Sequence, residues 1–221
     1  MVNKSKEILL LLVVLNACSS IKDSPKYQLS DGRYEFRQPG AKYKKVLLYV
    51  KEDTVRIFLE GKIKEPFIPE PLKDQFFLKH SFDIDVITVP FKYRPITIGL
   101  PRQLTTDFNG NVFIGYRVDR FRLINRETPV GWKQIYKHRG LSIGGFSGLG
   151  STAITPWTTN NKTTDEYNGF ILTRGLALMV GVNNLTVGIG VGWDYLTDRD
   201  KDVWIYQNKP WYGLTLGLNL N

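Results

Sequence analysis

The sequence predicts an all-β protein, a small antiparallel up-and-down β-barrel of eight strands preceded by a short β-hairpin unit. In its second half, strand-length segments alternate large apolar residues with small or polar ones, the period of two that β-strands have. Of the 20 glycines, 13 lie in the last 82 residues, where small side chains suit the narrow interior of a small barrel. A composition of 42% hydrophobic and 13% aromatic residues excludes a disordered chain.

The first residues are arranged as in an export signal. Lys4 and Lys6 precede an apolar run over residues 8–15, which is too short for a membrane-spanning helix of about 20 residues. The run ends in Leu15-Asn16-Ala17-Cys18, a string that resembles the lipobox of bacterial lipoprotein signal peptides. This resemblance implies cleavage before Cys18, the single cysteine, and its acylation with palmitate-type chains that hold the protein to membrane lipid. The alternative is an ordinary secretory leader with an incidental cysteine.

Composition divides the rest of the chain. Residues 1–17 are the expected signal peptide, 18–29 a lipidated tether, 30–62 a small antiparallel β unit, 63–80 a proline-rich linker and 81–221 the barrel. Charge has a boundary near Gly140: residues 18–139 carry 23 basic and 14 acidic side chains, whereas residues 140–221 carry five basic and six acidic ones. For an exported protein with no nucleic-acid-binding motif, we expect glycolipid phosphates or an envelope protein as partners, and no nucleic acid.

Strands of membrane-spanning length are expected in the barrel region. Because single-chain barrels have an even strand count from eight upward, the unit at 30–62 is expected to supply two more strands to the six found there. Aromatic residues near the strand ends favour a membrane-embedded barrel, and a soluble lipocalin-like barrel is the alternative. The six candidates are Phe82–Tyr93, Asn111–Ile124, Gln134–Gly150, Gly169–Val182, Leu185–Leu196 and Tyr206–Leu220.

Several strings after Cys18 resemble those of Bacteroidota-type outer-membrane lipoproteins without known activity. This resemblance covers most of the chain and implies an outer-membrane location and a barrel shape. Ser19 beside Cys18 is similar to the sorting signal for outer-membrane delivery. The strings are Leu29-Ser30-Asp31-Gly32, Phe91-Lys92-Tyr93-Arg94-Pro95, Phe108-Asn109-Gly110, Gly115-Tyr116-Arg117 and the run from Trp204 to Trp211.

Charged residues inside the predicted strands are the candidate site. By the period of two, Asp83 and Asp85 share a face, as do Arg117 and Asp119. We expect a network of paired charges in the barrel interior, because an unpaired buried charge is costly. A metal or ligand site using Asp83, Asp85 and Asp194 is the alternative. The network comprises Asp83, Asp85, Arg94, Arg117, Asp119 and Asp194.

No motif of a known catalytic site occurs. The chain has no Gly-x-Ser-x-Gly elbow and no His-Glu-x-x-His string, so we assign no catalytic residue, metal ligand or cofactor. A lipid-modifying barrel enzyme would have to use His138 with Ser142. The sequence therefore favours a structural or interaction role in the cell envelope. A small-ligand-binding barrel and a lipid-modifying outer-membrane enzyme are the alternatives.

Overall fold

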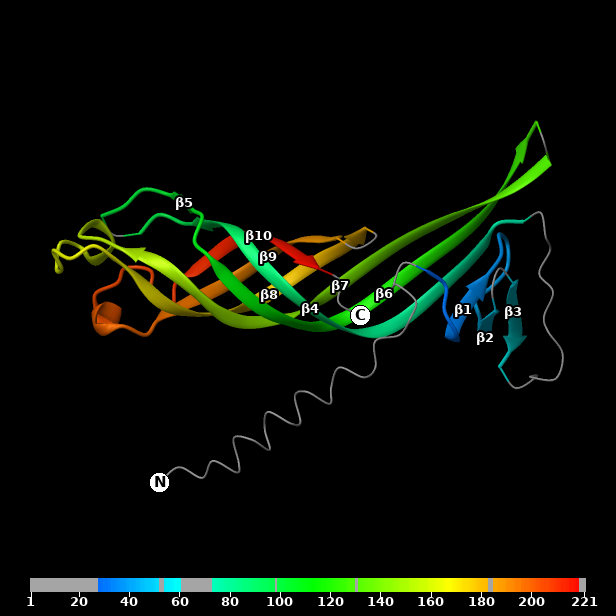
Figure 1. The fold of residues 1–221 in the computed structure, drawn as a ribbon, viewed down its shortest axis with the longest axis horizontal. Helices are drawn as coiled ribbons and strands as arrows, with labels where there is room; N and C mark the ends of the chain where they lie inside the picture. The colour runs from blue at the N-terminus through cyan, green and yellow to red at the C-terminus, as the bar shows by residue number, and fades with distance from the viewer. Residues whose placement is uncertain are drawn as a thin grey trace, which may run out of the picture.

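The computed structural model describes residues 28–51, 54–60, 73–97, 99–129, 131–182 and 185–218. It confirms the predicted antiparallel all-β fold (Figure 1). Cys18 and residues 19–27 of the predicted tether lie outside the described residues. No helix in the described ranges has the length and apolar character needed to cross a membrane. The strands are β1 (Gly32–Arg37), β2 (Lys44–Lys51), β3 (Thr54–Leu59), β4 (Gln75–Arg94), β5 (Gln103–Thr105), β6 (Asn109–Thr128), β7 (Gly131–Ile154), β8 (Tyr167–Val182), β9 (Leu185–Leu196) and β10 (Pro210–Leu218).

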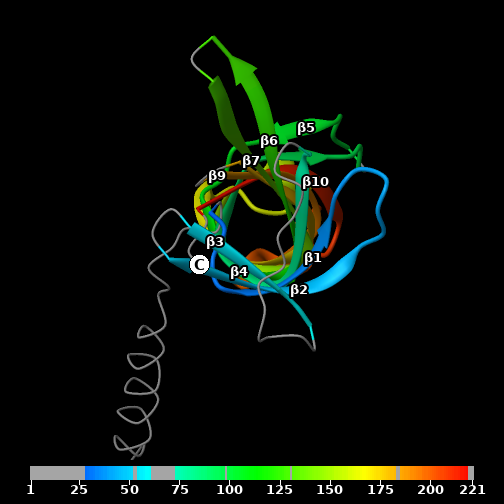
Figure 2. The same ribbon diagram turned by 90° about the vertical axis from the view of Figure 1, so that its right-hand side faces the viewer.

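Six strands close into a ring. β4, β6, β7, β8, β9 and β10 pair in that order, and β10 pairs back onto the second half of β4, from Val86 to Tyr93 (Figure 2). The ring therefore has six strands where the sequence predicted eight. The reason is the length of β4: its first half pairs with β1 through residues 76–78, while β10 occupies the same edge farther along. The N-terminal unit extends this sheet and does not enter the ring.

The part of the sheet beyond the ring, called the extension below, consists of β1–β3, the first half of β4 and residues 120–139 of β6 and β7. β4 begins at Gln75, so the segment 63–80 predicted as a linker contains a strand; residues 61–72 lie outside the described ranges. Alternation in β1 and β2 places apolar side chains on one face, where they pack against β4 and β6. This core consists of Tyr34, Phe36, Val46, Leu48, Ile57, Phe77, Phe121 and Leu123.

A buried apolar layer crosses the middle of the ring. Phe113, Met179 and Trp211 are fully buried and come from three different strands. A second cluster closes the end where the long loops meet, the loop end. There Trp204 and Tyr206, just after the 3-10 helix η3 (Arg199–Asp202), pack on Ile154, Ile171 and Leu196. The strand predicted from Tyr206 begins only at Pro210, because residues 204–208 form turns that cover this end.

Close strand packing requires glycine at position 144. A Cβ atom there would lie 2.2 Å from the carbonyl oxygen of Ile114 and 2.4 Å from the Cα of Gly115. At the next position, Gly145, the nearest atom would be 3.6 Å away. A methyl group would therefore clash with backbone atoms at Gly144, whereas at Gly145 there is room for it.

We expect Gly144→Ala to lower the free energy of unfolding by about 1–3 kcal/mol, the usual cost of overpacking, because backbone atoms must move. Gly145→Ala is the matched control and should change it little. Urea unfolding, followed by tryptophan fluorescence, measures both. Equal effects of the two substitutions would contradict the close packing of β6 and β7.

Candidate functional site

The ring places charge inside and large apolar side chains outside. On β4, Phe82 is 69% exposed while the neighbouring Asp83 is fully buried, and the alternation repeats at Ile84 and Asp85. The exposed apolar residues of all six strands form one surface, called the apolar band below. It consists of Phe82, Ile84, Val86, Phe91, Tyr93, Val112, Ile114, Tyr116, Leu141, Ile143, Leu149, Phe170, Leu172, Leu176, Leu178, Val180, Leu185, Ile189, Tyr195, Tyr212 and Leu214.

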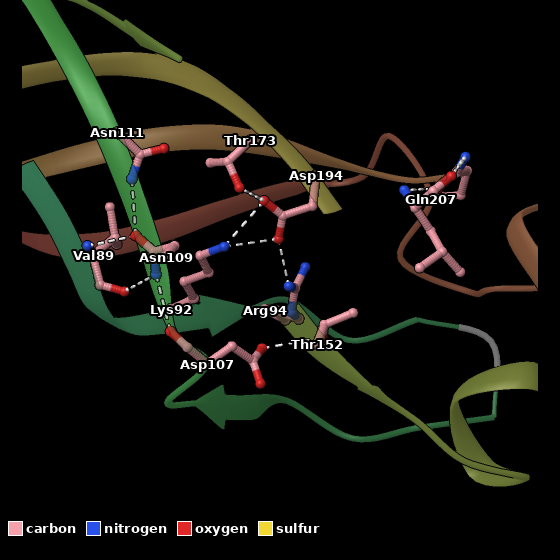
Figure 3. A network of polar contacts seen from close by, with 11 residues as sticks. Val89, Lys92, Arg94, Asp107, Asn109, Asn111, Thr152, Thr173, Asp194 and Gln207 are labelled. Carbon is pink, nitrogen blue, oxygen red and sulfur yellow. Dashed lines mark hydrogen bonds and ion pairs between the residues drawn. The ribbon is translucent and has the colours of Figure 1, made fainter. Parts of the chain in front are cut away.

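One interior cluster is centred on Asp194 of β9 (Figure 3). Lys92 Nζ lies 3.1 and 3.0 Å from the two carboxylate oxygens, and Arg94 Nη2 donates to Oδ2 at 2.6 Å. The hydroxyl of Thr173 on β8 donates to Oδ1 at 2.9 Å. Asp194 thus links β4 to β8 and β9 across the ring, and one carboxylate neutralises part of the charge of two buried cations.

Aromatic rings cover the two cations of this cluster. Lys92 Nζ lies 4.8 Å from the centroid of Trp211, and the Arg94 guanidinium lies 4.8 Å from Tyr206 and 5.5 Å from Trp204. Burial raises the pKa of the Tyr206 phenol above its ordinary value, so this ring stays neutral beside the guanidinium. Cation–π contacts in a desolvated place stabilise charges that one carboxylate cannot fully balance.

Asn109 of β6 bonds to the backbone of β4 beside this cluster. Its side-chain amide donates to the carbonyl of Val89 at 2.8 Å and accepts from the Val89 amide at 2.8 Å. The Asn111 amide donates to Asn109 Oδ1 at 2.9 Å (Figure 3). These bonds satisfy backbone groups of β4 that do not pair in the sheet, just where the register with β10 shifts.

A second interior cluster lies toward the extension. Arg117 Nε donates to both oxygens of Asp119, at 2.9 and 3.0 Å, and Arg117 Nη1 is 3.8 Å from Asp83 Oδ2. The Ser142 hydroxyl donates to Asp83 at 2.5 Å, and His138 Nε2 is bonded to Asp119 Oδ1 at 2.7 Å. Asp85 is fully buried one step farther along β4. The apolar layer of the ring, with Phe113 and Met179, separates this cluster from Asp194.

The structure thus places all six predicted network residues inside the ring, but in two groups. Asp194 and Arg94 belong to the first group, and Asp83, Arg117 and Asp119 to the second. Asp85 is buried on β4, two residues beyond Asp83. Lys92 was not among the predicted residues, although it lies two residues before Arg94 and therefore on the same face of a regular strand. Asn109 and Thr173 were not predicted either, because nothing but their place in the alternation distinguishes these polar residues in the sequence.

The enzymatic and metal-site alternatives find little support in this geometry. The proposed pair His138 and Ser142 is directed to two different carboxylates, those of Asp119 and Asp83. The oxygens of Asp194 accept from Lys92, Arg94 and Thr173, which leaves no open face for a metal ion. Within the described ranges, no group of three or more His, Cys, Asp or Glu residues could hold one.

No protein-family model matches the chain, and neither a curated protein nor a solved structure is significantly similar to it.

We expect Asp194→Asn to lower the free energy of unfolding by about 3–5 kcal/mol, because Lys92 and Arg94 then lie buried without a counter-charge. The double variant Lys92→Met/Asp194→Asn should recover part of this loss. Urea unfolding provides the measurement. Asp165→Asn removes the partner of Arg199 in an exposed ion pair and is the control, with no measurable change expected. A loss as large in the control would contradict the special role of the interior cluster.

Proposed function

We propose that the protein is a lipid-anchored outer-membrane protein whose ring is embedded in the bilayer and seals itself, and whose role is structural or that of an interaction module. The distribution of side chains over the ring carries this proposal: charges face inward, while the outward surface is apolar on all six strands. In water, both the exposure of the apolar residues and the burial of the charges would cost free energy. In a bilayer the apolar surface meets hydrocarbon.

Strand length supports the same proposal. β9 has 12 residues and β10 has 9, close to the roughly 9–11 residues that a tilted strand needs to cross the hydrocarbon layer. Arg174 interrupts the band on β8, next to Trp193 of β9 in the strand register. A long arginine side chain beside an interfacial tryptophan can extend to the polar edge of a membrane.

A soluble ligand-binding barrel fits the interior less well. A pocket for a small apolar ligand needs an open, mostly apolar cavity. In this ring, Phe113, Phe146, Met179 and Trp211 fill the centre, and ion-paired side chains fill the space on both sides of them. The same packing leaves no polar path from one end to the other along these residues, which favours a sealed ring over a channel.

Loop lengths support an orientation. Strands β6 and β7 are joined by residues 129–130 and β8 and β9 by 183–184, whereas the loop end carries the long connections 95–108, 155–166 and 197–209. Outer-membrane barrels have short turns on the periplasmic side and long loops outside. The extension would then lie in the periplasm. Cys18 precedes Gly32 by 14 residues, a span of at most about 50 Å, so an anchor in the inner leaflet is within reach.

An outward-facing charge distinguishes the membrane-embedded ring from a soluble one. Ile189 is 66% exposed at the middle of β9, so Ile189→Lys would be nearly neutral in water. At the centre of a bilayer we expect it to cost about 2–4 kcal/mol of stability. Ile96→Lys, at a 72% exposed position in the loop after β4, is the matched control. Urea unfolding in lipid vesicles compares them, and equal stability of the two variants would contradict embedding.

Acylation is tested separately at Cys18. Metabolic labelling with an alkyne fatty acid should tag the wild-type protein and leave Cys18→Ala untagged, because the chain has no other cysteine to which a lipid could be attached. The Cys18→Ala ring should still require detergent for extraction, since the apolar band would hold it in the membrane. Equal labelling of both forms would contradict the lipid anchor, and extraction of Cys18→Ala into plain buffer would contradict the embedded ring.

A further inference from the structure

Three arginines surround one phenylalanine ring on the outward face of the extension. The guanidinium carbons of Arg37, Arg120 and Arg122 each lie 5.3 Å from the centroid of Phe76. Phe76 sits between Arg37 of β1 and Arg122 of β6 in the strand register. These contacts bury the ring to 8% exposure and hold the three cations close together. We call this group the arginine cluster.

Two more cations face the cluster from β7. The register places Arg139 directly opposite Arg120 and Lys137 directly opposite Arg122. Like charges directly opposite each other in an antiparallel pair destabilise it. Among the described residues, one carboxylate bonds to the cluster: Asp74, whose Oδ2 is 2.7 Å from Arg122 Nη2. The arrangement leaves a net positive charge that an external anion would neutralise.

A buried donor of the cluster also lacks a partner. Arg37 Nε is inaccessible to solvent and makes no hydrogen bond within the described part of the chain. Its guanidinium is held between Phe76 and Tyr43, 4.9 Å from the centroid of the latter. A planar guanidinium group can donate two parallel hydrogen bonds to the oxygens of one phosphate. A cluster of arginines is therefore better suited to binding phosphate than to binding a simple monatomic anion.

The position of the cluster identifies the source of the phosphate. On β6 and β7 the pair Arg120–Arg139 is followed, two residues along each strand, by Val118 and Leu141, and then by Tyr116 and Ile143 of the apolar band. Two residues of strand span about 7 Å. With the band in hydrocarbon, the cations lie in the headgroup layer, which adds roughly 5–8 Å on each side of a hydrocarbon core about 30 Å thick.

We propose that the arginine cluster, with Lys137 and Arg139, binds the phosphate groups of anionic phospholipids in the leaflet next to the extension. This inference rests on the proposed embedding of the ring. An acidic protein could also neutralise these cations, but the continuous apolar surface directly beside them is better matched by a molecule with both a phosphate and acyl chains.

The test uses the full-length protein in vesicles of phosphatidylcholine alone or with added phosphatidylglycerol. We expect phosphatidylglycerol to raise the thermal unfolding midpoint of the wild type by several degrees. The double variant Arg120→Gln/Arg139→Gln should lose more than half of this shift. Lys42→Gln/Lys45→Gln removes the same charge from exposed positions on and just before β2, away from the apolar band, and should keep the shift. Heat-dependent gel migration verifies that both variants are folded.

Three outcomes would overturn the inference. They are an absent shift in the wild type, an equal loss in both double variants, or an equal shift produced by inorganic phosphate with phosphatidylcholine alone, which would assign the site to a soluble anion. Retention of the wild type in phosphatidylcholine vesicles after a carbonate wash is measured in parallel. Failure of retention contradicts the embedded ring itself, whereas retention without a phosphatidylglycerol effect contradicts the lipid site alone.

Discussion

Pairing between β10 and the second half of β4 is the constraint on which the rest of the structure depends. It joins the last strand of the sheet to an early one and leaves no open edge in the ring. With every ring strand paired on both sides, backbone polar groups are satisfied without water, so the outward face can be apolar on all six strands. Closure also creates a narrow interior that side chains fill. The charged side chains among them must therefore neutralise one another.

The interior charged residues connect neighbouring strands through ion pairs and hydrogen bonds. Asp194 receives hydrogen bonds from β4 and β8, and Arg117 reaches carboxylates on β4 and β6. Each bond is strong because water is excluded, and each would be costly to leave unmade. A side chain whose polar atoms are all hydrogen-bonded or ion-paired to neighbouring residues is a poor nucleophile or metal ligand.

The local alternation of apolar and polar residues predicted much of this arrangement. The pairing of strands that are distant in sequence could not be predicted from it. β9 coincides with the predicted segment Leu185–Leu196, because its period of two is unbroken. On β4, Asp83 and Arg94 have opposite parity and would face opposite ways in a regular strand. They share the interior because the register with β10 shifts near Pro90, which has no amide to donate. The number of strands in the ring was not predicted, because it depends on which strand edge β10 pairs with. That pairing joins residues more than 100 positions apart in the sequence.

The same topology accounts for the charge boundary in the sequence. Pairing of β7 with β8 begins at Gly140 opposite Gly181, so Gly140 is where β7 passes from the extension into the ring. Before it, β1–β3 and parts of β4, β6 and β7 build the extension, where cations face outward and only their stems need apolar contact. After it, the chain builds most of the ring wall, where an outward charge such as Arg174 is rare among the described residues. The basic excess thus follows from the side of the apolar band on which each stretch lies, and the cations gather where that band ends.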